Sequence, residues 1–203
     1  VAATDEVMAH WAGLGYYARA RNLHAAAKLC VEHHGGALPR DFEALHALPG
    51  IGRSTAAAIL SQAHGDRFPI LDGNVKRTLA RWHGVSGWPG TPAVEKQLWT
   101  LAESLVAGVP EGRMADYTQA QMDFGATLCT RARPACLHCP VYEGCVALRD
   151  GRVDALPTPR PCKILPEREA VALLLENTRG ELLLQRRPPT GIRAGLLRPR
   201  TQP

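Results

Sequence analysis

Apolar side chains recur at helical spacing along most of the chain, up to about residue 148. The clearest example follows Thr91-Pro92, a typical helix start, where Val94, Leu98, Leu101 and Leu105 fall on one helical face. Further helical segments, separated by glycine and proline, cover residues 4–11 (with Thr4 as the expected N-cap), 18–34, 41–47, 53–63, 75–82 and 117–128. This part of the chain is therefore predicted to be mainly α-helical.

The pattern changes after the helical part. Residues 150–168 carry four prolines with scattered charge, which is typical of an interdomain linker. Two apolar runs follow, at 170–175 and 182–185, separated by turn residues at 177–180, and they predict a strand, a turn and a strand. A buried helix is the alternative, but the central turn residues argue against it.

Composition sets broad limits on function. The 203 residues are 45% hydrophobic and 21% charged, which fits a globular protein with one or two cores. No run reaches the ~18 apolar residues that a membrane span needs, so no membrane partner is expected. The net charge of +5 and the pI of 9.1 suit nucleic acid, and a plain basic surface is the alternative. The opening at Val1 and the ending in Arg-Pro-Arg-Thr-Gln-Pro predict a fragment.

Four cysteines lie within one short stretch, at Cys129, Cys136, Cys139 and Cys145. Clustered thiolates favour zinc or an iron–sulfur cluster. Disulfides are disfavoured because three of the four lie within ten residues and no signal peptide points to an oxidising compartment. Zinc ribbons usually offer two C-x2-C pairs, whereas this run has one, so iron–sulfur is favoured and zinc remains open. Reduced cysteines also suit a cytoplasmic protein.

The segment Leu48-Pro-Gly-Ile-Gly-Arg-Ser-Thr-Ala56 connects two predicted helices. Gly50 and Gly52 allow a tight turn and close approach of a ligand to the backbone. The next helix begins with free N–H groups, which favour a phosphate, so the segment predicts a hairpin that holds DNA without reading its sequence. An ordinary helical turn is the alternative. Asp72 precedes another predicted helix, where capping is the common role of an aspartate.

The hairpin, the aspartate and the C-x6-C-x2-C-x5-C spacing, in this order, resemble the endonuclease III (helix-hairpin-helix-GPD) superfamily of DNA glycosylases. The resemblance implies a mainly α fold and an aspartate, Asp72, that stabilises the oxocarbenium ion formed at the sugar C1′ when the base leaves. It also implies how the chain divides into domains. Residues 1–128 would form a glycosylase domain, with its helix-hairpin-helix at about 41–64, and residues 129–149 a [4Fe-4S] loop. The linker at 150–168 would then lead to the first β-hairpin of a truncated Nudix-like 8-oxoguanine recognition domain at 169–203.

The segments Gly13-Leu-Gly-Tyr-Tyr-Ala-Arg-Ala-Arg-Asn-Leu-His24 and Leu71-Asp-Gly-Asn-Val-Lys-Arg77 look like those of adenine DNA glycosylases of the MutY type. That resemblance implies hydrolytic removal of adenine mispaired with 8-oxoguanine or guanine in double-stranded DNA, by a monomer of the bacterial cytoplasm that associates with the nucleoid. The resemblance implies that Leu14, Gly15 and Tyr16 enter the duplex as a wedge, although packing in the core is the alternative for Tyr16. It implies that Asn74 supports the sugar and the attacking water. The residues implied to contact DNA are Gly50, Gly52, Arg53, Ser54, Arg131 and Arg133.

Ser54 occupies the place where lyase members of the superfamily carry a lysine, so the resemblance implies a glycosylase without an efficient β-lyase step. Two departures stand out. The family's catalytic glutamate, which protonates adenine N7, is expected before Val1, and Glu6 does not match it, so the fragment is expected to be impaired alone. After Pro-Pro-x-Gly the family has Trp-Gly-Gly, whereas residues 192–195 read Ile-Arg-Ala-Gly.

Three rival functions remain. The first is a bifunctional endonuclease III-type glycosylase and lyase, against which Ser54 and the 170–185 strands argue. The second is a non-catalytic DNA-binding fragment, and the third is a zinc-containing structural protein.

Overall fold

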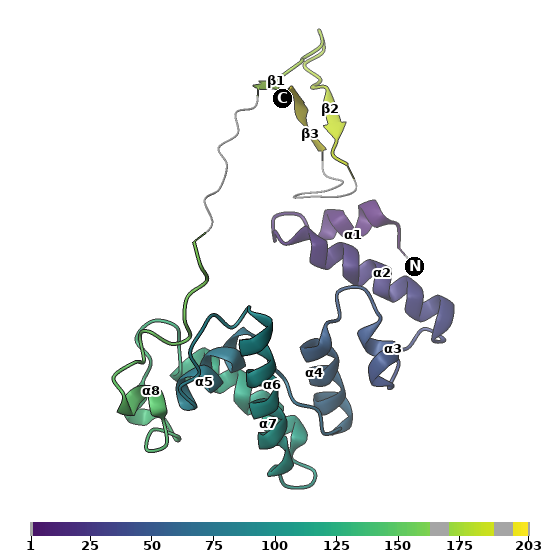
Figure 1. The fold of residues 1–203 in the computed structure, drawn as a ribbon. Helices are drawn as coiled ribbons and strands as arrows, with labels where there is room; N and C mark the ends of the chain where they lie inside the picture. Colours follow the sequence, from purple (N-terminus) through teal and green to yellow (C-terminus); the bar gives the residue numbers. More distant parts are fainter. Residues whose placement is uncertain (1, 163–170, 189–196, 203) are drawn as a thin grey trace. The chain divides into compact units, whose positions relative to one another are not determined.

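The computed structural model describes residues 2–162, 171–188 and 197–202, and it is mainly helical, as predicted (Figure 1). Its helices are α1 (Thr4–His10), α2 (Tyr17–His33), α3 (Phe42–His46), α4 (Arg53–His64), α5 (Gly73–Trp82), α6 (Pro92–Ala107), α7 (Met114–Asp123), the π-helix η1 (Phe124–Leu128), the 3-10 helix η2 (Cys136–His138) and α8 (Val146–Arg149). None of the described helices is long and apolar enough to cross a membrane.

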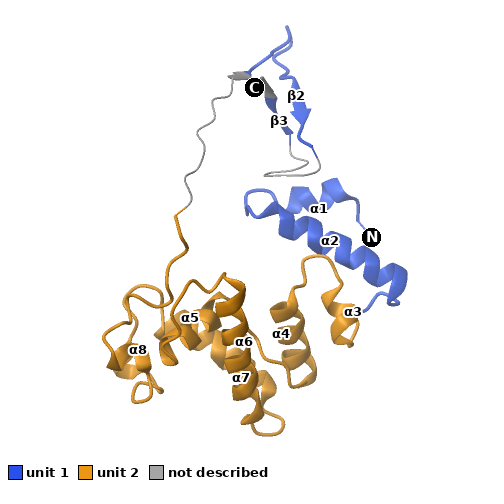
Figure 2. Cartoon of the chain, viewed as in Figure 1, with its two compact units in different colours: residues 1–37, 163–203 blue, residues 38–162 orange. Residues whose placement is uncertain are grey.

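The chain divides into two compact units, coloured separately in Figure 2: residues 1–37 with 163–203, and residues 38–162. The second unit contains the cysteine run, the hairpin and Asp72. Helix α5 is central to it, since α5 packs against α6, α7, η1 and α8, while α4 packs against α3 and α7. The buried core of this unit comprises Ala57, Ile70, Leu71, Val75, Leu79, Ala80, Val85, Leu98 and Ala102.

Local capping chemistry explains where several helices begin. Asp41 Oδ1 accepts a hydrogen bond from the Ala44 amide at 2.8 Å, and Asp72 Oδ1 accepts one from the Val75 amide at 2.8 Å. Helix α6 begins at Pro92, as Thr91-Pro92 predicted. The prediction for Thr4 was wrong: Thr4 is the first residue of α1 rather than its N-cap, and its hydroxyl lies 3.4 Å from His24 Nδ1 instead.

The predicted helix over 117–128 changes its winding near its end. Helix α7 ends at Asp123, and a π-helical turn covers Phe124–Leu128, closed by a hydrogen bond from Cys129 N to Phe124 O at 2.9 Å. Gly125 of this turn is buried, and a Cβ placed there would lie 2.6 Å from Asn74 Cβ. The wider turn therefore lies directly against the start of α5.

The described part of the predicted linker, up to Cys162, belongs to the second unit. Leu156 is buried, the Gly87 amide donates to Thr158 Oγ1 at 3.0 Å, and Arg152 donates to Ser86 Oγ at 2.6 Å. Residues 151–162 are thus held on the connection between α5 and α6. The later part of the linker lies outside the described residues.

In the first unit, α1 and α2 pack against each other, and Cys30 is a buried residue of α2. The unit also holds a small antiparallel sheet of β1 (Val171–Leu173), β3 (Leu197–Gln202) and β2 (Leu184–Arg186), in that spatial order.

The predicted turn at 177–180 is present, since Leu183 N donates to Leu175 O at 2.8 Å and Asn177 N donates to Glu181 O at 3.0 Å. The two predicted strands pair next to this turn, through that Leu183–Leu175 hydrogen bond and an antiparallel bridge between Glu176 and Leu182. Farther from the turn β3 lies between them, with Ala172 opposite Thr201 and Gln185 opposite Arg198. Strand β3 was not predicted. Residues 192–195, which depart from the family pattern, lie outside the described residues.

Candidate functional site

The hairpin between α3 and α4 uses its two glycines differently. Gly50 has φ +81°, a left-handed conformation that favours glycine, and it completes a turn closed by Ile51 N donating to Leu48 O at 3.1 Å. Gly52 is the N-cap of α4 with φ −84°, and no atom lies within 4 Å of where its Cβ would be. Gly50 therefore serves the fold, whereas Gly52 leaves open space beside the free N–H groups of α4.

Ser54 joins the hairpin to the loop that carries Asp72. Its hydroxyl oxygen accepts a hydrogen bond from the Leu71 amide at 2.9 Å, and both Ile70 and Leu71 are buried. The first turn of α4 is thereby fixed against the residue immediately before Asp72. These two sequence motifs, 18 positions apart, meet in the structure.

Asp72 is half-buried at the N-terminus of α5. One carboxylate oxygen caps the helix through Val75, so the common capping role is real. No described residue donates a hydrogen bond to its second oxygen. The carboxylate is therefore held in place by one oxygen and leaves the other available to a ligand.

Asn74 is held by an arginine that the sequence reading did not single out. Arg77 donates to Asn74 Oδ1 at 2.9 Å, to Cys129 O through Nε at 2.8 Å, and to Gly125 O. It connects the start of α5 with the π-turn and the first cysteine. Residues 74, 77 and 81 are spaced three and four apart, which places them on one face of a helix, and this spacing is the signal that could have revealed them.

The four predicted cysteines line one small cavity together with Arg81. Cys129 follows the π-turn, Cys136 begins the 3-10 helix, Cys139 follows it, and Cys145 is the N-cap of α8. Burial raises the pKa of the Cys136 thiol, and the nearby Cys129 and Cys145 raise it further.

Among the described residues, no three metal-ligating side chains form a group that could hold a metal ion. Four thiols around one hollow nevertheless form a donor set of the kind that an iron–sulfur cluster uses.

The predicted basic contacts differ in their surroundings. Arg131 and Arg133 are exposed on the cysteine loop, and Arg133 has a left-handed φ of +54°. Arg53, in contrast, is paired with Glu103 at 2.7 Å, and its guanidinium lies 3.8 Å from the centre of the Trp99 ring. A phosphate that approaches Arg53 would compete with Glu103.

The segment Leu14-Gly15-Tyr16 connects α1 to α2 in the first unit. Leu14 is 68% exposed and Tyr16 is 83% exposed, so Tyr16 is not a core residue of the described chain. Its φ of +46° is left-handed, and the Trp11 indole fixes the turn by donating to Gly15 O at 2.9 Å. The loop thus presents two apolar side chains to solvent.

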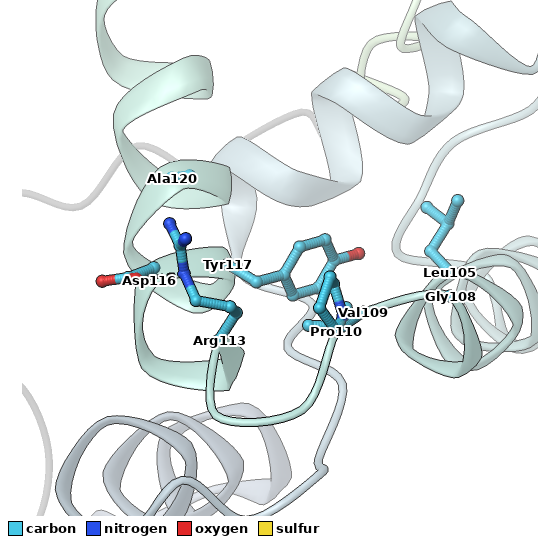
Figure 3. A pocket seen from close by; sticks show the side chains of 8 residues that line it. All are labelled: Leu105, Gly108, Val109, Pro110, Arg113, Asp116, Tyr117 and Ala120. Carbon is cyan, nitrogen blue, oxygen red and sulfur yellow. Dashed lines mark hydrogen bonds and ion pairs between the residues drawn. The ribbon is translucent and has the colours of Figure 1, made fainter.

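Two hollows near α7 were not predicted. The first, of about 490 Å³, lies where α6 connects to α7 (Figure 3), and Arg113 and Asp116 form an ion pair of 2.6 Å at it. The second, of about 580 Å³, is lined mainly by apolar side chains of α5, η1 and α7, including Trp82 and Phe124. Tyr117 lines both, and burial raises the pKa of its hydroxyl.

The hairpin between α3 and α4, hydrogen-bonded to the loop that carries Asp72, has the arrangement of a helix-hairpin-helix module. Residues 1–104 match the family model described as HhH-GPD superfamily base excision DNA repair protein, and the chain belongs to this superfamily.

Its relatives include the adenine DNA glycosylase of Buchnera aphidicola subsp. Acyrthosiphon pisum, 38% identical over 85% of this chain and 49% of the relative. The human adenine DNA glycosylase is 46% identical over 72% of this chain and 26% of the relative. The chain therefore spans about half of the first relative and about a quarter of the second.

Solved structures are similar as well. A thermostable thymine-DNA glycosylase matches with a TM-score of 0.63 and 30% identity over 73% of this chain and 67% of that one. A non-covalent endonuclease III–DNA complex matches with a TM-score of 0.59 and 25% identity over 74% of this chain and 67% of that one.

We expect Gly125→Ala to destabilise the second unit, because the new Cβ would meet Asn74 Cβ at 2.6 Å and Asn74 backbone atoms at 3.2 Å. Overpacking of this kind costs about 1–3 kcal/mol, measurable as a lower urea midpoint by circular dichroism. Gly108→Ala is the matched control, since the nearest atom to its new Cβ would be Leu105 O, 3.8 Å away. Equal midpoints for the two variants would contradict the close approach of η1 to α5.

Proposed function

We propose that this chain is part of an adenine DNA glycosylase, which hydrolyses the N-glycosidic bond of adenine mispaired with 8-oxoguanine or guanine in double-stranded DNA. The observation that carries the proposal is the hydrogen bond from the Leu71 amide to Ser54 Oγ, which joins the hairpin, the proposed phosphate site, to the residue immediately before Asp72. The similarity to relatives named adenine DNA glycosylase supports the choice of base.

In this proposal Asp72 faces the sugar C1′. Loss of the base leaves positive charge on the sugar, and a fixed carboxylate stabilises that charge. The capping hydrogen bond to Val75 holds one oxygen in place, so the carboxylate needs little reorganisation during the reaction. Asn74, oriented by Arg77, supports the sugar and the attacking water.

DNA is proposed to bind through its phosphates at the hairpin. The N–H groups near Gly50, Gly52 and Ser54 would donate to phosphate oxygens, which gives affinity without sequence preference. Arg53, Arg131 and Arg133 would add positive charge. Leu14, Gly15 and Tyr16, of which Leu14 and Tyr16 are exposed, would enter the duplex as a wedge and replace part of the stacking that an extruded base loses.

Cys129, Cys136, Cys139 and Cys145 are proposed to hold one [4Fe-4S] cluster. When bound, the cluster would serve as a rigid cross-link of the 129–149 loop, which keeps Arg131 and Arg133 in position. Residues 1–128 would form the glycosylase domain and residues 169–203 the start of a Nudix-like domain after the linker. The protein would act as a monomer in the bacterial cytoplasm, on nucleoid DNA.

Ser54 helps to distinguish a purely hydrolytic glycosylase from one that also acts as a lyase. A serine hydroxyl cannot form the Schiff base through which lyase members cut the strand, so base release would proceed by hydrolysis alone. Its oxygen also accepts the Leu71 hydrogen bond, which gives Ser54 a structural role beside the aspartate.

We expect Asp72→Asn to lower the rate of base release at least about 100-fold, because a neutral amide cannot balance an oxocarbenium charge. The measurement is single-turnover adenine release from an A:8-oxoguanine duplex, with the chain alone and with the chain joined to the remaining segments of its bacterial relative. Asparagine is also a good N-cap, so the fold should be retained.

Asp41→Asn is the matched control, because Asp41 caps α3 with the same 2.8 Å hydrogen bond. Equal loss of activity in the two variants would contradict a catalytic role for Asp72. Efficient trapping on DNA by borohydride, with strand cleavage, would assign the chain to the bifunctional class instead.

We expect Gly52→Val to weaken DNA binding about tenfold, equivalent to ~1.4 kcal/mol, because its side chain would occupy the space where the phosphate approaches. The loss should be equal for matched and mismatched duplexes in fluorescence anisotropy titrations. Gly108→Val is the control for a β-branched residue at an uncrowded position, where the Cβ would lie 3.8 Å from Leu105 O. Unchanged affinity of a folded Gly52→Val variant would exclude the hairpin as the phosphate site.

Anaerobically purified protein should be brown, with about four irons and four sulfides per chain. Cys136→Ser should lose this iron, whereas Cys162→Ser, at an exposed cysteine outside the cavity, should keep it. One zinc per chain without sulfide would show that the site is a zinc site and not a cluster.

A further inference from the structure

Arg81 is a buried arginine beside the cysteine cavity. Only 3% of the residue is exposed, and it lines the cavity with the four cysteines. Its Nη1 lies 3.5 Å from Cys129 Sγ and donates to Thr130 O at 2.6 Å. A permanently charged guanidinium is therefore fixed next to the thiols.

The other donors of Arg81 are used by backbone carbonyls. Nε donates to Val153 O at 3.0 Å and to Leu156 O at 2.8 Å, and Nη2 donates to Arg131 O at 3.2 Å. Each nitrogen of the guanidinium thus has at least one hydrogen-bond acceptor, but carbonyl oxygens carry no net charge. Within the described chain no carboxylate forms an ion pair with Arg81.

A buried cation without a counter-charge is strongly unfavourable. Several other arginines of this unit are handled differently: Arg53, Arg113 and Arg149 each pair with a carboxylate, and all three are exposed. The cysteine thiolates can supply negative charge at the cavity, and so can the carboxylate of Asp154, which raises the pKa of the Cys136 thiol but forms no ion pair with Arg81 in the described chain. Four thiolates around a cluster leave the assembly with net negative charge in both of its oxidation states.

We infer that Arg81 is the built-in counter-charge of the cysteine site, a positioning residue that stabilises the bound cluster electrostatically as well as through its hydrogen bonds. The inference rests on the proposed cluster and is independent of base release. Cluster potentials depend on nearby charge and hydrogen bonds. A fixed positive charge favours the reduced form, which carries one more electron, so its removal should make the reduction potential more negative.

The test compares two variants of the full chain, purified without oxygen. Arg81→Gln removes the charge and Arg81→Lys keeps it. The potential is measured by redox titration followed by visible absorbance, and loss of iron to a chelator is timed. We expect Arg81→Gln to have a more negative potential and faster iron loss, whereas Arg81→Lys should keep a potential close to that of the unchanged protein.

Arg149→Gln is the control, because it removes an equal charge from an exposed side chain shortly after Cys145, where water and salt screen it. If Arg81→Gln loads iron and its potential shifts no more than that of Arg149→Gln, Arg81 is only a tether and the inference is wrong.

Failure to load is also informative. If Arg81→Gln loses its iron while Arg81→Lys loads and keeps the potential, the charge is what matters and the inference holds. If neither variant loads although both fold by circular dichroism, the geometry of the guanidinium matters rather than its charge, and the inference is overturned.

Zinc in the unchanged protein would remove the proposed cluster and this inference together, and metal analysis reveals that outcome before any variant is made. Failure of the base-release assay leaves the potentials unaffected, since no DNA is present.

Discussion

Hydrogen bonds from two arginines of α5 to backbone carbonyls connect the cysteine loop to the rest of the second unit, residues 38–162. Arg77 and Arg81 lie about one turn apart and reach Cys129 O, Thr130 O and Arg131 O. The same helix begins at Asp72 and carries Asn74. One short helix thus sets the positions of the carboxylate and of the loop, and displacement of either end would be felt at the other.

The aspartate shows that a structural role and a chemical role can be combined in one side chain. Its capping hydrogen bond to Val75 is an ordinary feature of helix starts, and it also removes the rotational freedom of the carboxylate. The two glycines of the hairpin, in contrast, have different roles. Gly50 supplies the left-handed turn, and Gly52 leaves the approach to α4 open. Two glycines in one motif can thus be required for different structural reasons.

Features determined by neighbours in sequence were predictable. The caps at Asp41 and Asp72 and the start at Pro92 follow from local hydrogen bonding. The cysteine spacing predicted one shared metal centre because its members are close along the chain, and the four cysteines do line one cavity.

Features determined by distant partners were not predictable. Arg77 meets Cys129 across 52 positions, and β3 separates two strands that alone read as a hairpin. The π-turn at 124–128 keeps the apolar pattern of an α-helix, so periodicity could not reveal it. The hydroxyl of Thr4 lies near His24, 20 positions away, instead of capping α1.

The stretch from Arg152 to Thr158 leaves the cysteine loop and is held by Arg81 through the carbonyls of Val153 and Leu156. One guanidinium therefore secures both the loop and the first part of the segment that leads out of the helical unit. Loss of the loop's structure would release that segment as well and expose its peptide bonds to cleavage. Limited proteolysis between residues 151 and 162 would then report whether the cysteine loop is folded. The assay needs neither DNA nor the visible absorbance of a cluster.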